Sequence, residues 1–329
     1  MRLRWWSLLF VVLLAGWPAA AQGVKVAVIE SWFIHNESMG DPIAVERGFY
    51  GDLRVEVIGG GPGLSPIDRT MAKARAGEIV FGVDYPQNIL EARERQRLPL
   101  VVVGHDFQKS AMRIVCWSPK RTAGDFRGRF ATWIGYDKPI KAVVGRNWQR
   151  QIQVVNQQGD PATLGGWLAK QYDCASAMIY NELLVIQRLA REGRIKDRYY
   201  VYSYPQFGVD WPENVLFTTE EIVAKHPQVV QRFVTARYRG FAWGFANREA
   251  AADILLKYNK NLDRRHEIEG MEAIHSIMVT PYTRQHGLGA VDPAAWDRLG
   301  RDLVRAGFYA QTPNVRAAYT TRFRSGVRP

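Results

Sequence analysis

Short apolar runs, rich in β-branched residues and bounded by polar residues or glycine, recur through the first half of the chain. Such runs are typical of buried β-strands, and stretches with helical spacing of apolar residues lie between most of them. The pattern predicts strands at residues 24–29, 55–58, 79–83, 100–103, 114–116, 130–134, 152–155 and 175–179.

Two prolines mark predicted helix starts between these strands. Pro66 and Pro86 suit the first helical turn, where a missing amide hydrogen costs nothing, and Ser65 can cap the helix that runs toward Ala76. The alternation of strand and helix implies βαβ units with buried parallel sheets. Because ligands of such sheets bind outside the carboxyl ends of the strands, we expect binding residues in the loops that lead from strand to helix.

The last third of the chain changes character and is predicted to be mostly helical. Thr218 and Glu221 have the spacing of a capping box, and apolar residues at helical period follow them. The expected helices lie at residues 227–247, 248–258, 263–279 and 293–306.

The first 21 residues have the features of an export signal. Arg2 and Arg4 give a basic start, and an uncharged apolar run covers residues 5–17. Small residues follow at Ala19 and Ala21, so we expect cleavage after Ala21. The apolar run is shorter than the roughly 20 residues that span a bilayer, and no cysteine for a lipid anchor adjoins the cleavage site. We therefore expect a soluble periplasmic protein.

Composition agrees with a folded, exported protein. The chain has 329 residues, of which 47% are hydrophobic and 23% charged, as in globular proteins. This length, less the signal, predicts two domains. The net charge is +12, but export removes nucleic acid from the expected partners.

Cysteine and histidine usage limits the possible chemistry. The only cysteines are Cys116 and Cys174, too few for a four-cysteine zinc site or an iron–sulfur cluster. An oxidising compartment permits a disulfide, but the sequence does not show whether the two Cα atoms approach, so the pairing stays open. The six histidines lack the spacing of the metalloprotease pair. We predict no metal and no cofactor.

Three stretches that follow predicted strands could carry binding groups. Residues 32–40 begin with Trp32, which is either a lid on the core or a stacking plate. The glycine-rich residues 59–63 could present amide groups to an anion, although they lack the lysine of a P-loop and a flexible turn is favoured. Residues 180–182, Tyr-Asn-Glu, suit a helix N-cap and also suit hydrogen bonds to a heterocycle. No Gly-x-Ser-x-Gly elbow supports a hydrolase.

In this order, the motifs resemble a family of periplasmic solute-binding proteins of ABC importers. The branch includes binders of nitrate, sulfonate and taurine and binders of thiamine pyrimidine and riboflavin. Residues 173–182 read DCASAMIYNE and look like the D-A-A-x-A-M-x-Y-N-E stretch of the vitamin-precursor binders. The other matching positions are Trp32, Gly40, Ala44 and residues 48–50, 55–57, 59–62, 76–78, 81–83, 98–103, 216–219 and 240–251.

The resemblance implies an α/β fold of the type II periplasmic binding-protein kind, with two lobes joined by two crossover segments around a ligand cleft. Lobe one would comprise residues 22–115 and 212–329, and lobe two residues 116–211. Carried over by position, the ligand-binding residues are Trp32 as a plate against a flat ring, Glu37, Asp84 and Tyr85 from lobe one, and Trp133, Tyr180, Asn181 and Glu182 from lobe two.

The chain departs from this pattern at one place. Pyrimidine-binding relatives have an asparagine followed by a histidine where this chain has Glu37 and Ser38. The main hypothesis is a binding component that captures a flat vitamin precursor, as a monomer, and delivers it to a permease. A binder of sulfonate, taurine or nitrate is the alternative. A third reading, an enzyme like the pyrimidine synthase of the same superfamily, lacks the cysteine-rich iron motif, and we predict no enzymatic activity.

Overall fold

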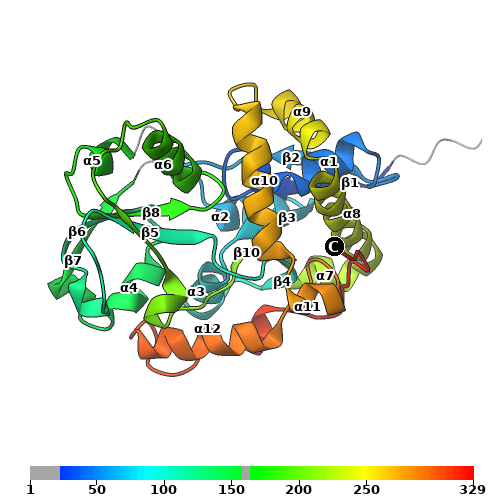
Figure 1. Cartoon of the computed structure of the whole chain (residues 1–329). Helices are drawn as coiled ribbons and strands as arrows, with labels where there is room; N and C mark the ends of the chain where they lie inside the picture. The colour runs from blue at the N-terminus through cyan, green and yellow to red at the C-terminus, as the bar shows by residue number, and fades with distance from the viewer. Residues whose placement is uncertain (1–22, 158–163) are drawn as a thin grey trace, which may run out of the picture.

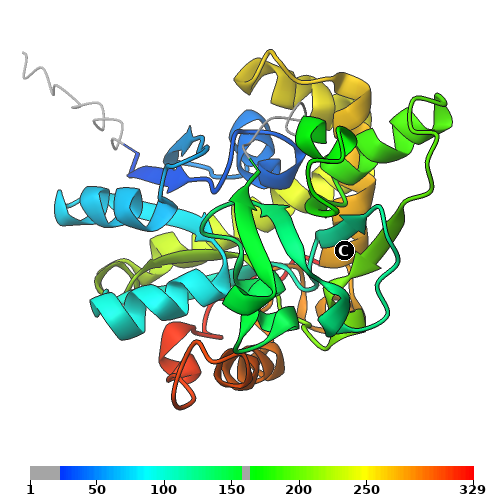
Figure 2. The same cartoon turned by 90° about the vertical axis from the view of Figure 1, so that its left-hand side faces the viewer.

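The computed structural model describes residues 23–157 and 164–329, so the predicted export signal lies outside the described residues. The described chain forms two α/β lobes, each built around one five-stranded sheet (Figure 1). In the view of Figure 2 the second lobe faces the viewer. No helix in the described ranges is long and apolar enough to cross a membrane.

The first sheet has the strand order β2-β1-β3-β10-β4. Strands β1 and β2 are parallel, as are β1 and β3, whereas β10 runs antiparallel to both β3 and β4. The bounds are β1 (Lys25–Ile29), β2 (Arg54–Ile58), β3 (Ile79–Asp84), β4 (Leu100–Phe107) and β10 (Glu213–Thr219).

The second sheet has the strand order β7-β6-β8-β5-β9. Strand β6 is parallel to β7 and β8, and β5 is antiparallel to β8 and β9. The bounds are β5 (Met112–Cys116), β6 (Gly128–Thr132), β7 (Ile152–Asn156), β8 (Cys174–Met178) and β9 (Tyr200–Ser203).

Every strand expected from the sequence is confirmed, but the sheets are mixed and not purely parallel, and β9 and β10 were not predicted. Strand β10 has buried polar residues that hide its strand character in the sequence. Thr218 is one of them, and its hydroxyl donates to the carbonyl oxygen of Val80 at 2.6 Å. It is therefore Thr219 that caps the next helix, with its Oγ1 accepting the amide of Ile222 at 3.2 Å, and the predicted capping box at Thr218 is wrong by one residue.

The helices expected in the last third are confirmed within one residue at their ends, and α11 was not predicted. Ser65 caps its helix as expected, because its Oγ accepts the amide of Asp68 at 3.1 Å. The helices are α1 (Gly40–Glu46), α2 (Pro66–Arg75), α3 (Pro86–Gln96), α4 (Lys138–Val144), α5 (Gly165–Leu168), α6 (Glu182–Arg191), α7 (Glu220–Lys225), α8 (Pro227–Ala246), α9 (Arg248–Tyr258), α10 (Arg264–Met278), α11 (Pro281–His286) and α12 (Pro293–Arg305).

Two chain segments cross between the sheets, one between β4 and β5 and one between β9 and β10. The boundary expected after residue 115 falls inside β5, which belongs to the second sheet. We propose that the first crossing lies at residues 108–111. Glu213, at the start of β10, joins the two crossings, because its carboxylate accepts the Ser110 hydroxyl and the Ala111 amide.

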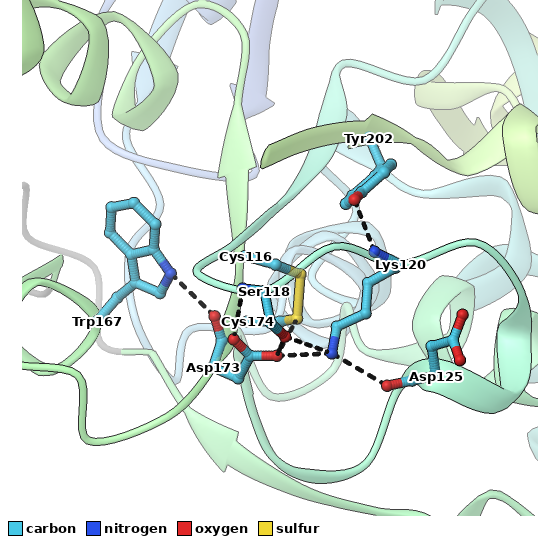
Figure 3. Close-up of a disulfide and its surroundings, with 8 residues drawn as sticks. All are labelled: Cys116, Ser118, Lys120, Asp125, Trp167, Asp173, Cys174 and Tyr202. Atoms are coloured by element: carbon cyan, nitrogen blue, oxygen red, sulfur yellow. Dashed lines mark hydrogen bonds and ion pairs between the residues drawn. A yellow bond between two sulfur atoms is a disulfide. The ribbon is translucent and has the colours of Figure 1, made fainter. Parts of the chain in front are cut away.

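Cys116 and Cys174 form a disulfide, which settles the pairing that the sequence left open (Figure 3). The two residues face each other in register on the antiparallel strands β5 and β8, with Cα atoms 4.1 Å apart. Next to it, Lys120 Nζ lies 2.6 Å from Asp173 Oδ2 (Figure 3). The bond therefore ties together two neighbouring strands of the second lobe.

A buried arginine fixes the end of β1, where the first predicted binding loop begins. Arg237 on α8 is fully buried and pairs with Asp106 at 2.7 Å, with Glu30 at 3.2 Å and with Asp41. Arg237 reaches Asp41 because α8 packs closely against α1. This close packing requires glycine at position 240, since a Cβ atom there would lie 1.9 Å from the carbonyl oxygen of Gly40. The loop between β1 and α1 is thus held at both ends.

Candidate functional site

The loop between β1 and α1 brings Trp32, His35 and Glu37 to the cleft between the lobes. Residues Asn36–Ser38 form a short 3-10 helix whose first amide, that of Asn36, donates to Glu267 Oε2 on α10 at 2.7 Å. The loop therefore has one anchor in β1 and another in the C-terminal helices. Its position depends on residues far away in the sequence.

A central cavity of about 40 Å³ lies between the lobes, and its walls come from both of them. Trp32 and Tyr85 stand on the first lobe, and Trp133, Tyr136 and Tyr180 on the second. The ring of Tyr85 meets that of Tyr136 edge to face, with centroids 4.6 Å apart. The complete lining is Ser31, Trp32, His35, Glu37, Tyr85, Trp133, Tyr136, Met178, Tyr180, Asn181 and Glu182.

Glu37 is the most heavily hydrogen-bonded group in this cavity. Its carboxylate accepts the Ser31 hydroxyl at 2.9 Å and the Tyr180 hydroxyl at 3.0 Å, and it also accepts Asn214 Nδ2. His35 Nε2 lies 3.2 Å from it. Tyr180 belongs to the second lobe, so its bond to Glu37 closes the cleft at its centre.

His35 and Glu37 shift each other's pKa in opposite directions. Burial acts to raise the pKa of Glu37, but the hydrogen bond and charge of His35, together with Asn214 and Ser31, hold that pKa below its usual value. Burial acts to lower the pKa of His35, and the hydrogen bond and charge of Glu37 outweigh it, so the pKa of His35 is raised. Each partner therefore favours the charged form of the other.

At the junction of β8 and α6, Asn181 has the N-cap position but caps no backbone amide with its side chain. Its Nδ2 donates to Glu182 Oε1 at 2.8 Å, and its Oδ1 lies 2.9 Å from His266 Nε2 on α10. Glu182 turns back to accept the Met178 amide at 3.0 Å, and burial raises the pKa of its carboxyl group. The asparagine therefore links the lobes.

All but one of the sequence-predicted site residues line the central cavity. The exception is Asp84, which lines an adjoining outer cavity of about 580 Å³. There Asp84 Oδ1 accepts the Tyr85 amide at 2.6 Å and Asn88 Nδ2 at 2.9 Å at the start of α3, and burial raises its pKa to about 6. A role in ligand binding stays a prediction for each of these residues.

The outer cavity opens at the mouth of the cleft beside both tryptophans. The predicted glycine-rich loop contributes Gly61 and Gly63 to it, and Leu64 and Ile134 expose large apolar side chains there. The complete lining is Trp32, Gly61, Pro62, Gly63, Leu64, Ser65, Pro66, Ile67, Asp68, Asp84, Asn88, Glu91, Ala92, Gln96, Trp133, Ile134, Gly135, Tyr136, Lys138, Asn156 and Gln157.

A third space, the α6–α10 cavity, has a volume of about 250 Å³ and is lined in part by residues of α6 and α10. It shares Trp32, His35 and Asn181 with the central cavity. Its lining is Trp32, Phe33, His35, Asn181, Val185, Arg188, Asn259, Asn261, Leu262, Asp263, His266 and Glu267. Trp32 is thus in the wall of all three cavities.

Sequence reasoning missed several residues of the site. His35 lies inside the stretch that was singled out, but the sequence favoured an ordinary solvated or core histidine. Tyr136 follows Trp133 closely and could have been found from that spacing. His266 and Asn214 carry no local signal, because only the fold brings them to the loop after β1. Within residues 23–157 and 164–329, no group of three or more histidine, cysteine or acidic side chains is arranged to hold a metal ion.

Comparison with known proteins agrees with this architecture. The family described as NMT1/THI5 like matches residues 35–251. The riboflavin-binding protein RibY of Chloroflexus aurantiacus is 28% identical over 116 residues, which cover 34% of this chain and 33% of RibY. The match therefore spans about a third of the length of that curated relative.

Solved structures extend the likeness to nearly the whole chain. The periplasmic aliphatic sulphonate-binding protein SsuA of Escherichia coli aligns with a TM-score of 0.63 and 12% identity, over 94% of this chain and 95% of SsuA. The periplasmic nitrate-binding protein NrtA of Synechocystis PCC 6803 aligns with a TM-score of 0.59 and 13% identity, over 91% of this chain and 86% of NrtA. At such identities the likeness shows the fold, the two-lobed type II periplasmic binding-protein architecture.

Proposed function

The chain belongs to the NMT1/THI5-like family, and from this premise we propose that it is the periplasmic solute-binding component of an ABC importer. Its ligand is a flat heterocyclic vitamin precursor of the thiamine-pyrimidine or riboflavin type. The two lobes close around the ligand, and the closed protein delivers it to a permease. The match to RibY and the likeness to solved periplasmic binding proteins support this proposal.

The single observation that carries the proposal is the pair of aromatic walls. Trp32 on one lobe and Trp133 on the other border the same cavity, with Tyr85, Tyr136 and Tyr180 beside them. Aromatic rings stack favourably on other flat rings and supply large apolar contact area at little cost in conformational entropy. Closure of two such walls selects for a planar ligand.

The polar groups at the edge of the cavity favour a ligand that donates hydrogen bonds. Glu37 and Glu182 present carboxyl oxygens, which can accept ring N–H or hydroxyl protons. Among the described residues, those that line the central cavity include no lysine or arginine. An anionic sulfonate or nitrate would meet two acidic side chains, and the one group that can become cationic, His35, is already paired with Glu37. We therefore favour the heterocycle over the anion.

The size of the central cavity requires the lobes to move. About 40 Å³ holds a few water molecules and no heterocycle. The cleft is kept narrow by hydrogen bonds between the lobes, from Tyr180 to Glu37 and between His266 and Asn181. A ligand must break or replace these bonds on entry. The ligand's own donors can then take the place of the Tyr180 hydroxyl on Glu37.

We propose binding without catalysis. The related synthase depends on a cysteine-rich iron motif, whereas both cysteines of this chain are joined in the disulfide of the second lobe. His35, the histidine that lines the central cavity, is paired with Glu37. These residues can orient and hold a ligand.

The test is titration calorimetry of the purified protein with a panel of ligands. The panel contains hydroxymethylpyrimidine, riboflavin, taurine, an alkanesulfonate and nitrate. We expect saturable binding of at least one ring compound and no binding of taurine, the alkanesulfonate or nitrate. Binding of taurine, the sulfonate or nitrate without binding of a ring compound would contradict the proposal. The absence of binding by every compound would also contradict it.

A further inference from the structure

The α6–α10 cavity differs in chemistry from the central cavity that it adjoins. The central cavity is walled mainly by aromatic rings. The α6–α10 cavity has apolar walls at Trp32, Phe33, Val185 and Leu262, and between them it presents amides from Asn181, Asn259 and Asn261, the imidazole of His266 and the guanidinium of Arg188. Such groups suit hydroxyls, which both donate and accept hydrogen bonds. The two spaces are therefore suited to different parts of one molecule.

The two cavities are continuous in their walls. Trp32, His35 and Asn181 belong to both, so a ring stacked on Trp32 has its edge next to the entrance of the α6–α10 cavity. The volume of about 250 Å³ gives room for a chain of several substituted carbons. A compact single ring that is bound at Trp32 would leave this space to water.

The charge of the α6–α10 cavity argues for an uncharged chain. Arg188 is exposed and makes no side-chain hydrogen bond or ion pair within the described part of the chain. Asp263 and Glu267 oppose its charge, although each already accepts a backbone amide, from His266 and Asn36 respectively. Burial and the charge of Arg188 lower the pKa of His266, so this imidazole is neutral near pH 7. A phosphate would find no excess of positive charge here.

We propose that the α6–α10 cavity is a second subsite, which binds a hydroxyl-bearing chain attached to the ring that stacks on Trp32. This inference rests on the proposed function and narrows its ligand class to heterocycles that carry an uncharged polyhydroxyl chain. Arg188 and Asn261 contact the chain from opposite lobes. Asn181 and His266 lie at its entrance, where their hydrogen bond at 2.9 Å must open for the chain to pass.

The experiment compares three probes that share one ring system. Riboflavin carries a ribityl chain, lumiflavin has a methyl group in its place, and flavin mononucleotide has a phosphate at the end of the chain. Titration calorimetry of the full-length mature protein should give riboflavin the lowest dissociation constant of the three. The double variant Arg188→Ala/Asn261→Ala should weaken riboflavin binding at least about tenfold and leave lumiflavin binding unchanged.

Arg191→Ala is the matched control, because Arg191 is exposed on the same helix but does not line the cavity. It should leave the binding of all three probes unchanged. Equal weakening of riboflavin and lumiflavin by the double variant, or no weakening of either, overturns the subsite. Tighter binding of flavin mononucleotide than of riboflavin overturns the proposal that the subsite prefers an uncharged chain. Binding of hydroxymethylpyrimidine but of neither flavin also overturns the subsite and leaves the proposed function standing, whereas failure of every ring compound overturns the proposed function itself.

Discussion

The hydroxyl of Tyr180 in the second lobe donates a 3.0 Å hydrogen bond to Glu37 Oε2 in the first. Both side chains are buried, and Glu37 also accepts Ser31 and Asn214 from its own lobe. Hydrogen bonds to a buried charged group are stronger than those between neutral groups. This contact therefore contributes to holding the two lobes together across the cleft.

Removal of the Tyr180 hydroxyl should open the ligand-free protein. Tyr180→Phe keeps the ring in the cavity wall but deletes the donor to Glu37, so the closed arrangement loses about 1 to 2 kcal/mol relative to an open one. Small-angle X-ray scattering should show a larger radius of gyration for the variant. Tyr172→Phe, in the second lobe and outside the central cavity, is the control. Identical scattering of Tyr180→Phe and wild type would show that the hydrogen bond from Tyr180 to Glu37 does not hold the lobes together.

Trp32 should dominate the binding of a ring ligand. Trp32→Ala removes one stacking surface and a large apolar contact, so we expect at least about a tenfold rise in the dissociation constant, which corresponds to about 1.4 kcal/mol. Trp32→Phe should lose less affinity than Trp32→Ala, because phenylalanine keeps an aromatic face. Trp243→Ala serves as the matched control, since Trp243 is half-buried on α8 and lies outside all three cavities. Equal affinities for wild type and Trp32→Ala would remove Trp32 from the site.

The His35 and Glu37 pair should give stability a defined pH dependence. The raised pKa of His35 stabilises the fold fully below its ordinary value of 6.5, and this stability is lost as pH rises through the raised pKa. The lowered pKa of Glu37 stabilises the fold above its ordinary value of 4.5, and this stability is lost as pH falls through the lowered pKa. The pair is therefore most effective in weak acid.

Glu37→Gln should reverse the first of these trends. Without the carboxylate, burial disfavours the imidazolium of His35, so the variant loses stability as pH falls below 6.5. Thermal melting at about pH 5.5 and about pH 8.5 should show the larger gap between wild type and variant at the lower pH. A gap that is the same at both values would mean that the pair is not ionised.

Glu213, at the crossing segments, should give stability a pH dependence opposite to that of Glu37. Burial raises its pKa to about 7, against hydrogen bonds from Ser110 and Ala111 that lower it. The unfolded chain therefore releases this proton first, and the contribution of Glu213 to stability falls as pH rises from about 4.5 to about 7. The melting temperature of Glu213→Gln, relative to that of wild type, should therefore increase as pH rises over this range. Glu249→Gln, exposed on α9, should show no such gain.

The disulfide should matter for stability and not for ligand affinity. Cys116 and Cys174 are 58 residues apart in sequence, and a cross-link of that span stabilises by about 4 kcal/mol in the chain-entropy description. Cys116→Ala/Cys174→Ala should lower the midpoint of urea unfolding accordingly. The dissociation constant for a ring ligand should stay unchanged, because neither cysteine lines the three cavities. A large loss of affinity in the folded variant would show that the disulfide also positions the cleft.

Local patterns determined most of the framework of this protein. Apolar runs located the strands expected in the first half of the chain, and helical period located the long C-terminal helices. The placement of polar residues after strands led to Trp32 and to Tyr180, which do lie in one cavity. This works because the side-chain period along a strand or helix reports which of its faces is buried.

The way these pieces meet depends on contacts between segments that are distant in the sequence. The antiparallel insertion of β10, the pairing of Cys116 with Cys174 and the contact of His266 with Asn181 have no counterpart in local sequence. Asn214 and Glu37 are 177 residues apart, and their bond exists because β10 returns from the second lobe into the first sheet. Periodicity records that a face is buried but not which distant segment covers it, and a polar group buried in that way takes its partner from the fold.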